Sequence, residues 1–192
     1  MEERFLKKEA RVLGVDDGPY RRGSKETLIV MTLYRSDGYL DAIITGRVTT
    51  DGSDSARIIS SILKDSRYAP QVRAIISDGA CLAGFNVLDL DELHENTEIP
   101  VITVSDERPD TAAVRSALRA NFPDWNERLE TITRHPPRKL DLPDGVCFVR
   151  EKGITPEAAD ELVKRCTVRG RTPEPVRLSH MIASALDGEI GR

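Results

Sequence analysis

Two acidic side chains stand at the ends of short apolar segments in this 192-residue chain. Asp16 ends the run RVLGVD at 11–16, and Asp78 follows the run VRAIIS at 72–77. Ligands of open α/β sheets gather at the carboxyl ends of parallel strands, so the two carboxylates are expected to converge if their strands are neighbours. Close carboxylates repel one another at neutral pH unless they share a proton or a cation. The pair is therefore a candidate metal site.

Mg²⁺ is the cation that this donor set favours, with Mn²⁺ as the alternative. Both ions suit hard oxygen ligands, and a Mg²⁺ site commonly combines one or two carboxylates with waters and substrate phosphate oxygens. The expected substrate is therefore a phosphodiester or a nucleotide. Asp54, in the sequence DGSD at 51–54, is the preferred third ligand, although such a residue can also be a plain helix N-cap. Asp17 is expected to be an outer or alternative ligand and a substrate contact.

A loop with two glycines follows Asp78 and reads DGACLAGFN. Glycines and free backbone N–H groups can cradle a phosphate, so Gly79, Gly84 and Asn86 are candidate substrate contacts. The loop lacks the G-x-G-x-x-G spacing and the P-loop lysine, which argues against nucleotide binding by those motifs. Cys81 has no histidine near it in the sequence, so core packing is a better explanation for it than nucleophilic catalysis.

The remaining polar residues give weaker signals. His94, His135 and His180 are isolated, without the spacing of a zinc site, and each is expected to be a surface or capping residue. The basic, glycine-bearing stretches RGR at 169–171 and GEIGR at 188–192 could touch phosphate, but solvated tails are their ordinary explanation.

Along the chain, the predicted elements that position these residues are first strands and then strands that alternate with helices. Strands are predicted over 11–16, 26–35, 39–49, 72–77, 99–104 and, as an edge strand, 146–150. Helices are predicted over 54–64, 85–94, 110–121, 124–134 and 155–166, with a last helix after 173–175 that ends near 186. Three antiparallel strands linked by hairpins, followed by parallel strands with helical crossovers, predict a mixed α/β sheet with helices on its faces.

Composition favours one globular domain over residues 1–192, with a C-terminal helical appendage from about residue 134. Hydrophobic residues make up 39% and charged residues 31% of the chain, which supports both a core and solubility. No apolar run approaches 18 residues and the first ten alternate charges, so we expect a cytoplasmic protein with no membrane contact. Three cysteines are too few for a disulfide framework. The net charge of −4 argues against unspecific coating of nucleic acid but permits a local basic groove.

Several segments resemble the archaeal "domain of unknown function 99" family, and the resemblance covers nearly the whole chain. The similar segments are RVLGVDDGP, DGSD, DG with the following AGFNVLD, IPVITV, PEPVRLSH and the Gly-x-x-Gly-Arg ending. The resemblance implies a ribonuclease H-like fold and a distant relation to endonuclease V. In endonuclease V a Gly-Val-Asp strand, a Glu on the first helix and an Asp-Gly strand end bind the catalytic metal. Asp16 and Asp78 match two of these positions directly, and the Glu position falls near Asp54.

The resemblance also shows departures that keep several functions open. The histidine of endonuclease V would fall near Gly84 and its lysine near Ser105 or Asp106, which leaves Arg108 as a substitute for the lysine. The leading expectation is a Mg²⁺-dependent or Mn²⁺-dependent nuclease or phosphodiesterase acting on DNA or RNA through Asp16, Asp78 and Asp54. The alternatives are a non-catalytic protein that binds nucleic acid or nucleotides, and a scaffold protein whose strand-end acids only cap turns.

Overall fold

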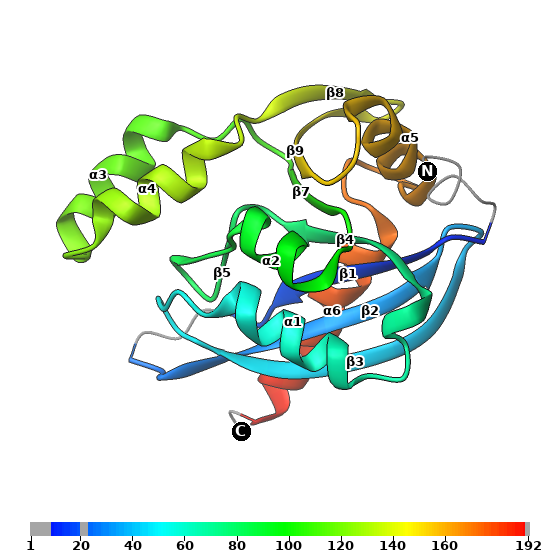
Figure 1. The fold of residues 1–192 in the computed structure, drawn as a ribbon, viewed down its shortest axis with the longest axis horizontal. Coiled ribbons are helices and arrows are strands. Elements are labelled where there is room, and N and C mark those ends of the chain that lie inside the picture. Colours follow the sequence, from blue (N-terminus) through cyan, green and yellow to red (C-terminus); the bar gives the residue numbers. More distant parts are fainter. Residues whose placement is uncertain (1–8, 20–22, 191–192) are drawn as a thin grey trace.

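A seven-stranded mixed sheet runs through the computed structural model, which describes residues 9–19 and 23–190. Its strand order is β3-β2-β1-β4-β7-β9-β8 (Figure 1). The strands are β1 (Arg11–Asp17), β2 (Glu26–Arg35), β3 (Tyr39–Thr49), β4 (Val72–Asp78), β7 (Val101–Ser105), β8 (Arg138–Leu142) and β9 (Gly145–Lys152). β1, β4 and β7 run parallel, and all other neighbours are antiparallel. The predicted mixed α/β sheet, with antiparallel strands followed by parallel ones, is confirmed.

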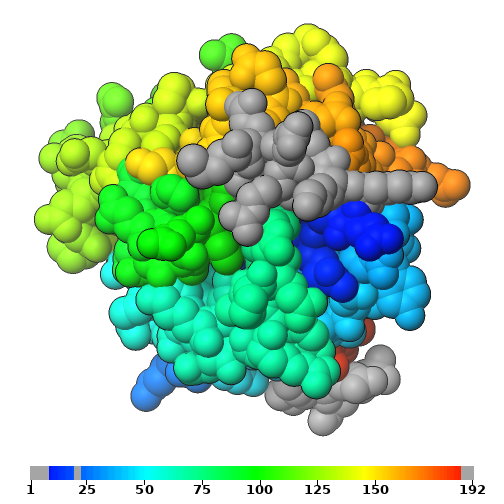
Figure 2. Space-filling view, turned by 45° about the vertical axis from the view of Figure 1, so that its right-hand side comes forward, coloured from blue at the N-terminus to red at the C-terminus, as the bar shows by residue number. Residues whose placement is uncertain are grey.

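Helices cover both faces of the sheet. One face carries α1 (Ser55–Asp65) and α2 (Leu90–Thr97), and the other carries α5 (Pro156–Cys166) and α6 (Glu174–Ile190). A hairpin of α3 (Thr111–Asn121) and α4 (Trp125–Arg134) extends beyond the sheet, and its yellow-green surface projects at the left of Figure 2. A 3₁₀ turn, η2 (Ala69–Gln71), precedes β4. Within the described ranges, every helix is too short or too polar to cross a membrane.

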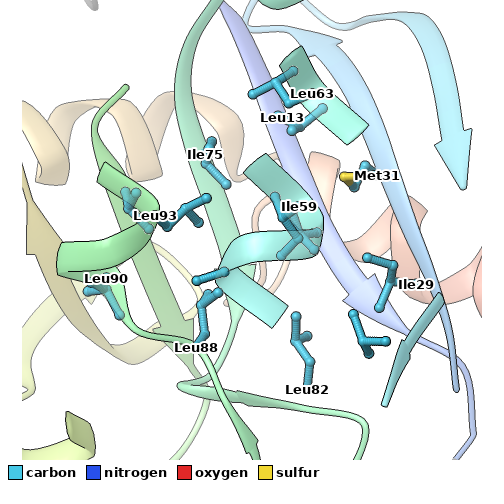
Figure 3. Close-up of a cluster of buried hydrophobic side chains, with 14 of the residues drawn as sticks. Leu13, Ile29, Met31, Ile59, Leu63, Ile75, Leu82, Leu88, Leu90 and Leu93 are labelled. Carbon is cyan, nitrogen blue, oxygen red and sulfur yellow. The ribbon is translucent and has the colours of Figure 1, made fainter. Parts of the chain in front are cut away.

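Two hydrophobic layers hold the central strands in place. On the first face, side chains such as Leu13 of β1, Ile59 of α1 and Leu93 of α2 are completely buried (Figure 3). On the second face, Val12 of β1 and Ile76 of β4 pack in a layer with α5 and α6. Complete burial of one such side chain contributes roughly 1.5–3 kcal/mol. Because β1 and β4 are buried on both sides, the positions of their carboxyl ends are fixed.

The predicted helix over 85–94 is wrong in its first part. Cys81–Leu82 (β5) and Asn86–Val87 (β6) form a small hairpin, and the helix begins only at Leu90. The side chain of Asp89 caps it by accepting hydrogen bonds from the backbone N–H groups of Asp91 and Glu92. An aspartate N-cap satisfies helix donors that otherwise lack partners, which explains this starting point.

The region after residue 134 also differs from its predicted form, because it contains two strands as well as two helices. β9 was expected at an edge of the sheet, but it lies between β7 and β8. β8 forms the edge, and its burial alternates along RKLDL with a period of two residues. That alternation is typical of a strand with one buried face, but charged residues and the preceding prolines hide it in the sequence.

Candidate metal centre

The pairing of β1 with β4 brings Asp16 and Asp78 to the same edge of the sheet. The two strands are parallel neighbours, and Val15 lies opposite Ser77, so the following residue of each strand is an aspartate. Side chains alternate along a strand, and Ile76 packs in the layer that contains α6. Asp78 therefore leaves the sheet on the α6 side, where Asp16 contacts α6. The predicted convergence of the two strand ends is confirmed.

Asp16 is an almost completely buried carboxylate, with 4% of the residue exposed. Its Oδ1 accepts a hydrogen bond from the backbone N–H of Asp17 at 2.8 Å. Its Oδ2 lies 2.8 Å from Nδ1 of His180, which carries the hydrogen when Asp16 is ionised. Burial and then the negative charge of Asp78 raise the pKa of Asp16 to about 7. Asp16 is thus an acid that a nearby cation would readily ionise.

The neighbouring acids Asp17 and Asp78 also have raised pKa values. Asp78 is exposed at the strand end, yet the surrounding protein removes enough water to raise its pKa, and the charge of Asp106 adds to the effect. Burial also raises the pKa of Asp17, whose Oδ2 accepts a hydrogen bond from the backbone N–H of Ala83 at 2.8 Å. Asp17 therefore anchors the loop that follows β4, while Asp16 and Asp78 are the pair without an arginine or lysine partner among the described residues.

His180 is the site residue that sequence reasoning missed, since it was expected to be only a surface or capping residue. The N-terminal turn of α6 lies directly against β1, because a Cβ at Gly14 would overlap the backbone of Pro175. The hydroxyl of Ser179 donates to the carbonyl of Gly14 at 3.0 Å, which fixes the helix beside the strand. His180 comes next and reaches Asp16. The signal in the sequence was its place in the C-terminal segment that resembles the archaeal family.

Asp54, the predicted third ligand, is occupied elsewhere. Its carboxylate accepts hydrogen bonds from Thr49 N at 3.1 Å, from Thr49 Oγ1 at 2.7 Å and from Asn86 Nδ2 at 2.7 Å. Partial burial opposes ionisation, but these bonds outweigh it and lower the pKa of Asp54. Across residues 9–19 and 23–190, no group of three or more His, Cys, Asp or Glu side chains is arranged to hold a metal. The candidate site is therefore the pair Asp16 and Asp78, and His180 contacts Asp16 without completing a group of three that could hold a metal.

Asn86 is a correction to the predicted substrate contacts. It is completely buried, its Oδ1 accepts from Ser55 N at 3.1 Å, and its Nδ2 also donates to the carbonyl of Thr49 at 2.8 Å. Its amide holds the start of α1 and is not accessible to a substrate. Gly79 and Gly84 both have positive φ, at 63° and 84°, in the loop after β4.

Two further sequence predictions concern Arg108 and Cys81. Arg108 is exposed in the connection between β7 and α3, and its contact with substrate stays a prediction. Cys81 packs beside Val87 and Leu118 in the small apolar cluster under the α3–α4 hairpin. Burial raises the pKa of its thiol to about 12, so the thiolate is not available at neutral pH. Its predicted role in core packing is confirmed.

The sheet order and the flanking helices define a protein with the fold of endonuclease V. The chain is similar to endonuclease V from Ciona intestinalis, solved in complex with a 24mer DNA containing an inosine followed by a ribo-adenosine. The TM-score is 0.63 at 17% identity, with 97% of this chain and 89% of that chain covered. Human endonuclease V is similar at a TM-score of 0.60 and 16% identity, with 97% and 87% covered.

Sequence relatives give the family. The family model described as "Endonuclease dU" matches residues 8–187, and the chain belongs to this family. A UPF0215 protein of Methanopyrus kandleri is 38% identical over 189 residues, covering 97% of this chain and 95% of the relative. A UPF0215 protein of Thermococcus gammatolerans is 37% identical over 187 residues, covering 95% of each. A protein of unknown function from Archaeoglobus fulgidus has a similar crystal structure, with a TM-score of 0.82, 30% identity and coverage of 92% and 97%.

Proposed function

We propose that this protein is a divalent-metal-dependent nuclease that hydrolyses phosphodiester bonds in nucleic acid, with Asp16 and Asp78 as the metal ligands. The observation that carries the proposal is the pair itself, two carboxylates delivered by adjacent parallel strands to one edge of the sheet. The endonuclease V fold and membership of a family described as "Endonuclease dU" support the same class of reaction.

The donor chemistry of the pair fits a hard cation. Asp16 is buried and bears the repulsion of Asp78, and neither acid has a lysine or arginine partner among the described residues. A divalent ion would compensate both charges, and carboxylate oxygens suit Mg²⁺ or Mn²⁺. Such sites often use one or two carboxylates and fill the remaining positions with waters and phosphate oxygens, so a third protein acid is not required.

The chain's own residues would orient the reacting groups. Bound Mg²⁺ or Mn²⁺ would supply an activated water and charge stabilisation at the scissile phosphate. The hydrogen bond from Nδ1 of His180 fixes one oxygen of Asp16, and the N–H of Asp17 fixes the other. Asp17 holds the backbone of Ala83 and thereby the glycine-bearing loop, where Gly79 and Gly84 stay candidate phosphate contacts. His180 is therefore a positioning residue for Asp16.

The comparisons suggest which nucleic acids to try. The description "Endonuclease dU" makes DNA with a deoxyuridine the first substrate in our proposal, and the Ciona complex adds DNA with an inosine. Unmodified single-stranded and double-stranded DNA and RNA complete the set. Asp54 is not needed for this proposal, because its carboxylate already binds Thr49 and Asn86.

A non-catalytic protein that binds nucleic acid is the second candidate. The observation in its favour is that the described residues hold no cluster of three metal-ligating side chains. In this case the fold would bind oligonucleotides without metal, and the two acids would have no effect on binding.

Metal titration and cleavage assays on the same preparations separate the two candidates. We expect Mn²⁺ and Mg²⁺ to bind the wild type, measured calorimetrically, and to support cleavage of at least one substrate. Asp16→Asn and Asp78→Asn should lose both properties. Asp141→Asn is the matched control, since Asp141 is exposed and, among the residues that the structure describes, its ion pair is with Lys139 on edge strand β8. Wild-type protein that binds neither ion would refute the proposed function.

A further inference from the structure

A groove rich in arginine lies between the end of β7 and the connection from α5 to α6. Its volume is about 640 Å³, within the range of small-ligand sites. We name it the arginine groove, after the lining residues Arg169, Arg171 and Arg177. Asp106 and Glu174 also line it, and the exposed side chain of Val168 lies at the same place. The sequence suggested a solvated tail for residues 169–171, but they form a wall of this groove.

The arginine groove is next to the paired acids. β7 is the parallel neighbour of β4, with Val104 opposite Asp78, and Asp106 follows two residues later. The backbone N–H of Gly79 donates to the carbonyl of Val104 at 2.8 Å, which ties the two strand ends together. On the other side, Arg177 precedes His180 by three residues on α6, and residues three apart lie on one face of a helix.

Arg169 and Arg171 are the arginines of the groove that are most open to an anion. Arg171 pairs with Asp106 at 3.3 Å, and Arg177 pairs with Glu174 at 2.7 Å. The Arg171 side chain is 40% exposed, and an exposed ion pair of this kind contributes little. Arg177 is held more firmly, because its Nε and Nη2 both donate to the carboxylate of Glu174 and its Nη1 donates to Sδ of Met181. Arg169 is exposed, and within the described part of the chain no carboxylate lies within ion-pair distance of it. Guanidinium groups suit phosphate because their donors form a planar fork.

We propose that the arginine groove binds the phosphodiester backbone of the nucleic-acid strand that enters the Asp16 and Asp78 centre. The inference rests on the proposed function, because the groove would hold the strand that the adjacent centre cleaves. Three guanidinium groups against two carboxylates leave the groove net positive although the whole chain carries −4. Contacts to phosphate carry no base information, so the groove would position the strand without selecting its sequence.

The test measures binding apart from cleavage. In the full chain carrying Asp78→Asn, a labelled single-stranded oligodeoxynucleotide is titrated at several salt concentrations. Adding Arg169→Gln should weaken binding about fivefold and reduce the slope of log K against log salt by about 0.7, the contribution of one phosphate contact. Arg169→Gln with Arg171→Gln should double the change in slope. Arg169→Lys keeps the charge and should keep the slope. Arg67→Gln, at the opposite end of the sheet, is the matched control.

The outcomes also separate this inference from the proposed function. In the protein with both acids intact, Arg169→Gln should raise KM and leave kcat within about twofold, since the arginine acts on binding alone. Cleavage by the wild type with an unchanged KM and salt slope in both arginine variants would overturn the groove and leave the nuclease standing. Arginine-dependent binding without any cleavage would support the groove and overturn the nuclease. Loss of structure is excluded by equal thermal midpoints of the variants.

Discussion

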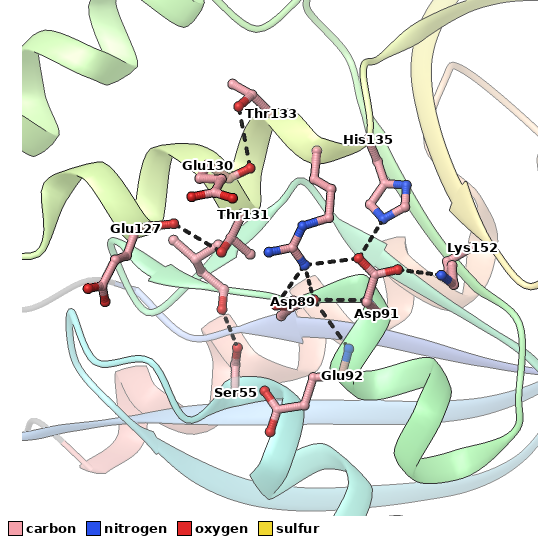
Figure 4. Close-up of polar contacts among 12 residues, drawn as sticks. Ser55, Asp89, Asp91, Glu92, Glu127, Glu130, Thr131, Thr133, His135 and Lys152 are labelled. Carbon is pink, nitrogen blue, oxygen red and sulfur yellow. Dashed lines mark hydrogen bonds and ion pairs between the residues drawn. The ribbon is translucent and has the colours of Figure 1, made fainter.

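Asp16 and Asp91 are aspartates of one chain in opposite electrostatic surroundings. Asp91, in the first turn of α2, is contacted by Arg134 at 2.9 Å, by His135 at 3.1 Å and by Lys152 (Figure 4). Partial burial opposes its ionisation, but these three partners hold the pKa of Asp91 far below its usual range. Burial and the charge of Asp78 instead raise the pKa of Asp16 to about 7.

The difference separates an acid that stabilises the fold from an acid that is a candidate for chemistry. The three partners of Asp91 come from α4, the segment after it and β9, so the ionised carboxylate joins α2 to three other parts of the chain. Its charge is already compensated. Asp16 has no arginine or lysine partner among the described residues; the ring of His180 contacts it, while Asp78 adds charge of the same sign. An acid at a strand end whose pKa is raised by burial and by a like charge is a candidate functional group. An acid that is paired with basic side chains of other elements stabilises the fold.

The largest expected effect is on the rate of cleavage, and it tests the contrast between Asp16 and Asp91 directly. Asp16→Asn and Asp78→Asn should each lower the rate of metal-dependent cleavage on the order of 10²–10³-fold, because the developing charge on phosphate loses its stabilisation. Asp91→Asn should leave the rate within about threefold. Initial rates at saturating Mn²⁺ measure both. An equal loss in the Asp91 variant would contradict the assignment of Asp91 to the fold.

Stability should show the reverse order. Asp91→Asn removes the charge shared by Arg134, His135 and Lys152, and we expect the free energy of unfolding to fall by about 2 kcal/mol, given the partial exposure of the partners. Urea denaturation at pH 7 measures it. Asp141→Asn, at an exposed position paired with the exposed Lys139, serves as the control and should change stability by less than about 0.5 kcal/mol. An Asp91 variant as stable as this control would show that the cluster is not a stabilising one.

His180 sharpens the comparison, because its Nδ1 lies 2.8 Å from the carboxylate of Asp16. His180→Ala should weaken Mn²⁺ binding about tenfold, as expected when a group that orients a metal ligand is lost. His180→Asn keeps a donor and should recover part of the affinity. Calorimetric titration of the metal checks both variants, and the pH at which binding is half-maximal should shift only in the alanine variant. Unchanged affinity in His180→Ala would remove its positioning role.

The smallest effect concerns pH. The folded pKa of Asp16 is raised to about 7, so protonated Asp16 is favoured in the folded state and its ionisation costs stability as pH rises from about 4 to 7. Without metal, Asp16→Asn should therefore match the wild type near pH 4 and exceed its stability at pH 8. Adding Mn²⁺ should stabilise only the wild type. Urea unfolding at each pH, with and without Mn²⁺, measures the differences. A wild type that gains stability over this range relative to the variant would contradict the sign.

The sequence was sufficient to predict the mixed sheet and, within the candidate site, the pair of Asp16 and Asp78. Apolar runs ending in acid predicted β1, β4 and the meeting of Asp16 with Asp78, because strand pairing follows from local pattern and short connections. The pattern could not predict that Asp54 and Asn86 bind each other, since that contact depends on how the β5–β6 hairpin folds over α1. His180 stayed hidden for a similar reason. Its partner is 164 residues away, a distance over which periodicity carries no information.

The close packing of α6 on β1 also determines when, during synthesis of the chain, Asp16 can gain its histidine contact. Ribosomes make chains from the N-terminus at about 5–20 residues per second, so the codon for His180 is read roughly 10–30 s after the one for Asp16. During this interval the nascent β1 has neither its helix cover nor the histidine contact of its last acid. A chain that stops before α6 therefore carries both acids of the candidate centre but not the histidine that contacts Asp16.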